Sequence, residues 1–157
     1  MRLTIPPEEE PREFTHILTD YNGVLAKDGF LFPGVREGLE ELGRLFSVHV
    51  ATADTFGTVA EQLKGLPLDL KVIPSNEPQD EAKLRILEQL GASNTIAIGN
   101  GRNDALMLKR AGLGICVVGE EGAAVQALVN AQVVVNNIGD AFGLLLNPYR
   151  IVATLRN

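Results

Sequence analysis

Four polar segments carry the side chains best suited to chemistry. They are Asp20-Tyr21-Asn22-Gly23, Thr52-Ala53-Asp54, Lys83 and the stretch from Gly99 to Asp104. A carboxylate can attack an electrophile or bind a cation, whereas a hydroxyl or an ammonium group can hold an anion. Together these residue types predict a site that binds a phosphoryl group and a metal ion.

Each of these residues also has an ordinary structural role when it is taken alone. Asp20 could only form a turn, and Thr52 could cap the helix that follows it. Lys83 is more often a solvated helix residue, and Asp104 would favour a helix N-terminus as readily as it would bind Mg²⁺. Gly99 and Gly101 let the backbone approach an anion, but no third glycine completes a dinucleotide fingerprint.

The elements that must position these residues follow from the hydrophobic pattern. Short runs rich in Val, Ile and Leu predict buried strands at residues 14–19, 47–52, 69–73, 95–98, 113–118 and 131–135. Helical spacing joins Val35, Leu39, Leu42 and Leu45, and again Ala82, Ile86, Leu87 and Leu90. The alternation predicts an α/β fold, a Rossmann-like parallel sheet flanked by helices, with ligands bound beyond the C-terminal strand ends.

The same pattern predicts one domain over residues 1–157, with a core at about 13–146. A chain of 157 residues can bury a core of its own, and no linker or repeat interrupts the alternation. Leu3-Thr4-Ile5 could add an edge strand, and Pro148 should interrupt the last helical segment.

Composition excludes several classes of protein. The net charge is −6, and no Lys/Arg-rich block could follow a phosphate backbone, so we expect no nucleic-acid partner. No apolar stretch is long enough to span a membrane, and the N-terminal Glu8-Glu9-Glu10 is unlike a signal peptide. The single cysteine, Cys116, lies in an apolar run and should be buried. We expect a soluble, cytoplasmic protein without a membrane partner.

In this order and at these positions, the motifs resemble the haloacid dehalogenase superfamily over residues 14–146. Asp20 matches the family's nucleophile, Thr52 its motif II hydroxyl, and Lys83 its motif III lysine. Asn100 and Asp104 match its paired acidic positions. Thr52-Ala53-Asp54 and the Gly99–Asp104 loop are also similar to segments of P-type ATPase phosphorylation domains.

The resemblance implies a mechanism and a set of ligands. Asp20 would attack the phosphorus of a small phosphorylated substrate, and Thr52, Ala53, Lys83, Asn22 and Gly23 would bind the phosphoryl group. Mg²⁺ would take oxygen from Asp20, the backbone carbonyl of Asn22, Asp104 and the side chain of Asn100.

Two positions depart from the family pattern. Where the family's phosphatases have an acid, this chain has Asn22, and an amide can neither protonate a leaving group nor activate water. Turnover of ordinary esters should therefore be slow, and a persistent aspartyl phosphate or activated acyl and aryl substrates are expected. Asn100 replaces a second acid, which should weaken Mg²⁺ binding.

The short stretches of chain from Asp20 to Thr52 and from Thr52 to Lys83 leave no room for a cap domain. The segment from Leu25 to Phe32 can form only a short hairpin with Asp28-Gly29 as its turn. Phe30 and Phe32 could close over a substrate or simply pack. Because capless relatives often cover their sites by oligomerising, the resemblance implies a homo-oligomer. His16 and His49 lie inside strands, and we expect both to be structural.

Two classes of function remain open from the sequence. The first is a Mg²⁺-dependent phosphatase or phosphotransferase that works through Asp20. The second is a phosphate- or metal-binding regulatory module that kept the fold and lost turnover, with Asn22 and Asn100 as signs of that loss. A receiver-like phosphoacceptor domain fits less well, since such a fold does not need the loop from Gly99 to Asp104.

Overall fold

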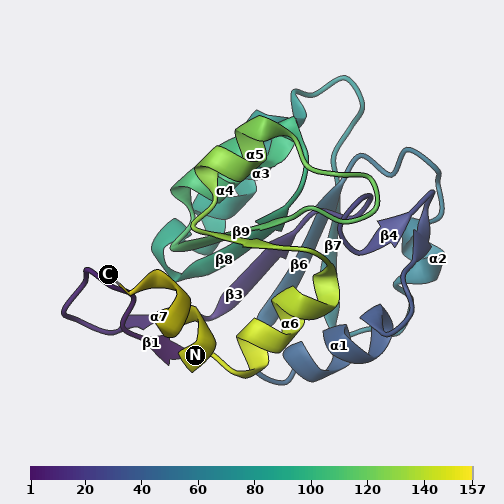
Figure 1. The fold of residues 1–157 in the computed structure, drawn as a ribbon. Coiled ribbons are helices and arrows are strands. Elements are labelled where there is room, and N and C mark those ends of the chain that lie inside the picture. The colour runs from purple at the N-terminus through teal and green to yellow at the C-terminus, as the bar shows by residue number, and fades with distance from the viewer. Residues whose placement is uncertain (157) are drawn as a thin grey trace.

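A six-stranded parallel sheet forms the centre of the computed structural model, which describes residues 1–156 (Figure 1). Its strands run in the order β10-β9-β8-β3-β6-β7. They are β3 (His16–Thr19), β6 (Ser47–Thr52), β7 (Leu68–Val72), β8 (Thr95–Gly99), β9 (Leu113–Val117) and β10 (Val133–Val135). All six strands expected from the sequence are present, so the predicted Rossmann-like architecture is confirmed.

Helices cover both faces of this sheet (Figure 1). One face packs against α3 (Gln79–Leu90), α4 (Ala105–Arg110) and α5 (Val125–Asn130). The other packs against α1 (Val35–Leu42) and α6 (Ile138–Leu146), and α7 (Tyr149–Leu155) follows after Pro148, as predicted. The short α2 (Val59–Gln62) and two 3₁₀ turns, η1 (Ala92–Asn94) and η2 (Arg102–Asp104), complete the helical elements of residues 1–156.

The expected hairpin after the first core strand is also present. It pairs β4 (Ala26–Lys27) with β5 (Phe30–Leu31) in antiparallel register. Asp28 and Gly29 both have positive φ angles, 51° and 85°, which is the backbone that a two-residue hairpin turn requires. We refer to residues 26–32 as the flap.

Two expectations about peripheral elements were wrong. Leu3-Thr4-Ile5 does not extend the main sheet, because β1 (Arg2–Leu3) pairs instead with β2 (Arg12–Glu13) in a separate antiparallel pair. Leu45 is not part of the buried stripe of α1. The helix ends at Leu42, Gly43 packs its backbone against Pro67, and the Leu45 side chain is 58% exposed.

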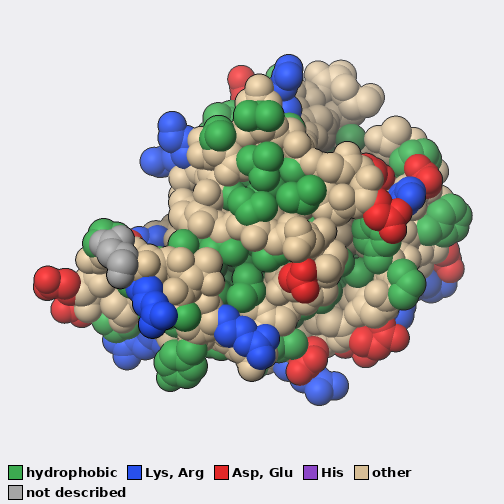
Figure 2. Space-filling model, viewed as in Figure 1, with side chains coloured by type: hydrophobic (Ala, Val, Ile, Leu, Met, Phe, Trp, Pro, Cys, Tyr) green, Lys and Arg blue, Asp and Glu red, His purple; other side chains and the backbone are tan. Residues whose placement is uncertain are grey.

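The surface shown in Figure 2 has acidic and basic side chains interspersed along its margin, with apolar side chains gathered near its middle. This face therefore does not present a single basic field of the kind that binds nucleic acid. No helix within residues 1–156 is both long and apolar enough to cross a membrane.

The two histidines lie side by side on neighbouring strands, away from the strand tips. His16 Nδ1 is 3.2 Å from His49 Nε2, and His49 Nδ1 is 3.5 Å from Asp69 Oδ2. Burial, and then the neighbouring His16, lower the pKa of His49, although Asp69 acts in the opposite direction. The surroundings of His49 therefore disfavour its protonated form.

Stability should fall on mild acidification because of His49. In the unfolded chain a histidine titrates near pH 6.5, so below that pH the unfolded state binds more protons than the folded state does. The raised pKa of Asp20 acts in the opposite direction over the same pH range, so the contribution of His49 is measured as a difference between two proteins. Between about pH 7.5 and about pH 5.5, the free energy of unfolding in urea should fall for the wild-type protein relative to His49→Gln. An equal pH dependence in the two proteins would show that His49 does not contribute.

Candidate active site

The predicted nucleophile lies at the tip of the central strand. Thr19 is paired with Val50 of β6 on one side and with Ile98 of β8 on the other, and the backbone N–H of Asp20 donates to the Ile98 carbonyl at 2.9 Å. The sheet reverses its order of connection at β3, which is where open α/β sheets bind ligands. Asp20, Thr52 and the loop after Gly99 thus meet at one edge of the sheet.

Lys83 lies between the two carboxylates of this edge. Its Nζ donates to Asp20 Oδ1 at 2.9 Å and to Asp104 Oδ1 at 2.7 Å. Only 1% of the Lys83 side chain is exposed, so the alternative of a solvated helix lysine is wrong. Helix α3 delivers it from its second turn, while neighbouring Ala82 and Leu87 pack into the core.

The charges of these three groups do not balance. Burial, and then the nearby Asp104, raise the pKa of Asp20 to about 6, although Lys83 acts in the opposite direction. Burial alone would lower the pKa of Lys83, but Asp20 and Asp104 together hold it above its ordinary value. Two carboxylates facing one ammonium leave excess negative charge, which a bound cation would neutralise.

Asp104 is held rigidly by the loop that carries it. Its Oδ2 accepts hydrogen bonds from the backbone N–H groups of Asn100, at 2.9 Å, and Gly101, at 2.8 Å. Gly99 makes this possible, because a Cβ at that position would lie 2.5 Å from Asp104 Cγ. Asp104 is fully buried at the end of η2, and α4 begins with the next residue.

Asn22 joins the loop after the nucleophile to the flap. Its Oδ1 accepts a hydrogen bond from the Gly29 N–H at 3.1 Å, and the next residue, Gly23, donates its N–H to the Ala26 carbonyl at 2.7 Å. Gly23 has a φ of 80°, and a Cβ there would lie 2.3 Å from Asn100 Nδ2. The predicted metal-binding positions Asn22 and Asn100 are thereby brought to adjoining loops.

Thr52 and Ala53 lie at the tip of β6, beside Asp20. The Thr52 side chain is buried, and its Oγ1 accepts a hydrogen bond from the Asp54 N–H at 3.1 Å. It does not cap the following helix. That role belongs to Asp54, whose Oδ1 accepts from the N–H groups of Thr58 and Val59 at 3.1 and 3.2 Å.

Two supporting residues were missed by the sequence reasoning. The hydroxyl groups of Tyr21 and Thr58 both donate to the carbonyl of Gly29, at 2.9 and 2.8 Å, and so hold the flap turn. Burial, helped by Asp54, raises the pKa of Tyr21 to about 12. The position of Tyr21 directly after Asp20 was the one available signal, whereas nothing in the sequence marks Thr58.

The residues at this edge fit a hard divalent cation with a small acidic donor set. Asp20 and Asp104 provide two carboxylates, and Asn100 Nδ2 donates to the Gly122 carbonyl at 3.3 Å, which leaves Oδ1 as the oxygen available to a cation. No group of three or more His, Cys, Asp or Glu side chains within residues 1–156 could hold a metal. Amide, backbone or water oxygens would therefore have to complete the coordination of a bound cation.

Comparison with solved structures supports the fold. The 3-deoxy-D-manno-octulosonate 8-phosphate phosphatase of Moraxella catarrhalis, solved with magnesium, phosphate and KDO, has a TM-score of 0.70 at 18% identity; the match covers 91% of this chain and 94% of that one. The cobalt-bound enzyme of Haemophilus influenzae has the same TM-score at 13% identity, covering 92% and 94%. At these identities the similarity shows a common fold.

Sequence comparison assigns the family. An uncharacterized protein of Methanocaldococcus jannaschii, MJ0073, is 52% identical over 80 residues, which are 48% of this chain and 86% of that protein. The family model for haloacid dehalogenase-like hydrolases matches residues 3–112, a segment that includes Asp20, Thr52, Lys83 and Asp104. The chain belongs to the haloacid dehalogenase-like hydrolase family.

Proposed function

We propose that the protein is a Mg²⁺-dependent phosphatase or phosphotransferase that forms an aspartyl phosphate on Asp20. The observation that carries this proposal is the buried Lys83, which holds Asp20 Oδ1 at 2.9 Å. Lys83 engages one carboxylate oxygen of Asp20 and leaves Oδ2 for in-line attack on phosphorus. The new Oδ–P bond forms as the bond from phosphorus to the leaving oxygen breaks, and the leaving oxygen keeps the electron pair.

The other residues of the site would bind charge that develops on the phosphoryl oxygens. Thr52, Ala53, Lys83 and the backbone of Asn22 would supply hydroxyl, ammonium and N–H donors there. The Gly23 N–H, which the sequence assigned to the same role, donates instead to the Ala26 carbonyl. Such donors stabilise a transition state without reorganising. Asp20, Asp104, the Asn22 carbonyl and Asn100 Oδ1 would hold Mg²⁺. The ion supplies electrostatic stabilisation of the transferring group.

The amide of Asn22 sets the expected rate. General acid–base help is worth about 10²–10⁴-fold, and Asn22 can supply none of it. Its Oδ1 already serves as a hydrogen-bond acceptor for the flap. Turnover of ordinary alkyl esters is therefore slow. The resemblance to P-type ATPase phosphorylation domains, which also lack this acid, supports a long-lived phosphoenzyme. The homo-oligomer expected for a capless member stays a prediction.

Phosphoenzyme trapping tests the nucleophile directly. Fresh protein incubated with acetyl phosphate and Mg²⁺ should gain one phosphoryl mass by intact-mass spectrometry. The adduct should be absent in Asp20→Asn and in a sample treated with a chelator, because both the attacking oxygen and the cation are then missing.

The same samples decide between the enzyme and the regulatory module. Binding of phosphate or of a metal fluoride that persists in Asp20→Asn, without any adduct on the wild-type chain, would support the module. An adduct on the wild-type chain that is unchanged in Asp20→Asn would place the nucleophile elsewhere.

Replacing Asn22 should restore acid–base catalysis. Asn22→Asp is close in shape and keeps the oxygen that accepts from Gly29, so we expect hydrolysis of alkyl phosphate esters to rise by about 10²–10⁴-fold. The matched control is Asn100→Asp, which should lower the Mg²⁺ concentration needed for half-maximal activity without this gain. Steady-state phosphate release measures both. Equal gains in the two variants would refute the role given to Asn22.

Removing the ammonium group should also destabilise the fold. Lys83→Met keeps most of the side-chain volume but leaves Asp20 and Asp104 buried without the cation that pairs with both, at a cost of about 3–5 kcal/mol. Urea unfolding measures the loss. In the double variant Lys83→Met/Asp20→Asn, the loss of unfolding free energy should be smaller than the sum of the losses in the two single variants, since one unpaired charge has been removed. Strict additivity would argue against the ion pair.

A further inference from the structure

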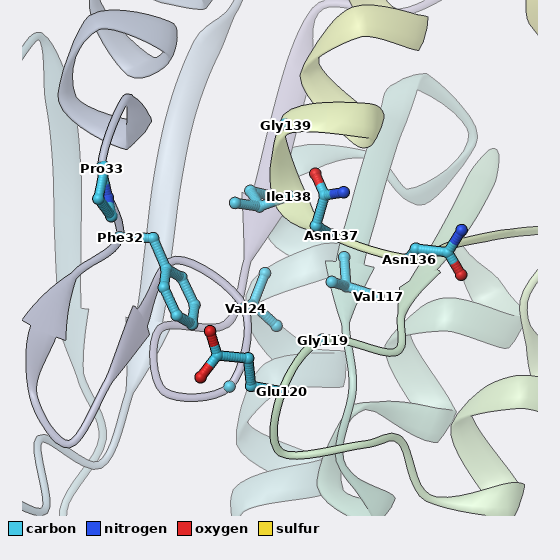
Figure 3. Close-up of a pocket in the computed structure, with 11 residues that line it drawn as sticks. Val24, Phe32, Pro33, Val117, Gly119, Glu120, Asn136, Asn137, Ile138 and Gly139 are labelled. Atoms are coloured by element: carbon cyan, nitrogen blue, oxygen red, sulfur yellow. The ribbon is translucent and has the colours of Figure 1, made fainter.

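A cavity of about 420 Å³ opens beside the loop that carries the nucleophile (Figure 3). We propose that it receives the leaving group of the substrate and selects one that is uncharged and mainly apolar, of which a phenol-type aryl group is the best match. This inference rests on the function proposed above and adds the substrate class for the same site.

The walls of the cavity come from three segments that are distant in the sequence, residues 23–33, 117–120 and 136–139, and its polar side chains are Glu120, Asn136 and Asn137. Val24 follows the nucleophile loop, Phe32 ends the flap, Val117 closes β9, and Ile138 begins α6. Figure 3 shows Phe32 and Val24 directed toward the same space, with Ile138 on its far side. A volume of this size and an apolar lining are typical of small-molecule sites.

The cavity adjoins the proposed active site through Gly23. This residue lines the cavity, and it also packs against Asn100, as the 2.3 Å approach of a Cβ to Asn100 Nδ2 shows. Gly119, which also lines the cavity, packs against the same residue, because a Cβ at Gly119 would lie 3.2 Å from the Gly23 carbonyl oxygen. Only Tyr21 and Asn22 lie between Asp20 and this wall in the sequence, so the cavity borders the loop that would bind the phosphoryl group.

Charge limits what the cavity accepts. The charged side chain that lines it is Glu120, which pairs with Lys27 of the flap at 2.5 Å. Within the described part of the chain no Lys, Arg or His lines the cavity. A second anionic group on the substrate, such as a carboxylate, would be desolvated beside the Glu120 carboxylate, and the neighbouring cation, Lys27, is already paired with Glu120. The cavity therefore disfavours substrates that carry an acid beyond the phosphate.

The chemistry of Asn22 points to the same class independently. With no acid to protonate it, the leaving oxygen must depart as an anion, which favours the weakly basic oxygen of a phenol over that of an alkyl alcohol. The aromatic ring attached to such an oxygen would lie against Phe32 and the aliphatic walls, where ring packing contributes beyond burial. Cavity lining and proton chemistry thus agree on an aryl phosphate.

Kinetics on matched substrates test this inference. We expect kcat/KM for phenyl phosphate to exceed that for 4-carboxyphenyl phosphate by about tenfold or more in the wild-type protein. Glu120→Gln should narrow the difference, since it removes the repelling charge and frees Lys27. Equal values for the two substrates, or no effect of Glu120→Gln on their ratio, would overturn the proposal.

The flap supplies a matched pair of variants. Phe32→Ala should lower kcat/KM for phenyl phosphate about tenfold, whereas Phe30→Ala should not, because Phe30 is 61% exposed and lies outside the cavity. Labelling by acetyl phosphate, whose leaving group is small, should also be unchanged in Phe30→Ala. Equal effects of the two variants would remove the cavity from substrate binding.

A binding measurement separates this inference from the proposed function. If acetyl phosphate gives no adduct at Asp20, the proposed function fails, and ¹⁹F NMR titration with 4-fluorophenol and 4-fluorobenzoate still probes the cavity. Weak binding of the phenol alone, lost in Phe32→Ala and kept in Phe30→Ala, would support the selectivity. No binding of the phenol, or equal binding of both probes, would overturn it.

Discussion

The buried contact of Lys83 with Asp20 and Asp104 is the interaction on which the site depends. It joins α3 to the tip of β3 and to the end of η2, three elements that are well separated in the sequence. An ammonium group that is 1% exposed is stable only because both carboxylates accept from it. The same contact leaves net negative charge at the strand tips. The fold thus places an excess of negative charge where the order of the sheet reverses.

Close backbone approach is the second constraint. Because Gly99 has no side chain, the Asp104 carboxylate can lie against its backbone. Gly23 likewise lets the loop after the nucleophile lie against Asn100. The flap is joined to this loop through Asn22 and to the core through Tyr21. Because the flap also forms a wall of the cavity, the residues that orient the nucleophile and those that would contact the leaving group belong to one packed unit.

Sequence patterns were sufficient for the sheet, and they singled out candidate site residues that the structure brings to one edge. Buried parallel strands have a continuous apolar run, and their polar tips mark one edge of the sheet, which is why Asp20, Thr52 and Asp104 could be singled out. The burial of Lys83 could not be predicted, since it depends on tertiary packing around α3. The cap of α2 by Asp54 was missed for a local reason: its φ of 48° is a conformation that the sequence does not mark.

Hydrogen bonds to two glycine N–H groups bear on the chemical lifetime of the site. Asn22 and Asn100 are each followed by glycine, the pairing most prone to deamidation, in which the next residue's amide nitrogen attacks the asparagine side chain. Gly23 N–H is held by the Ala26 carbonyl and Gly101 N–H by Asp104 Oδ2, so neither nitrogen is free to attack. The native fold thereby protects both amides, and ageing into aspartate is confined to molecules that have opened locally.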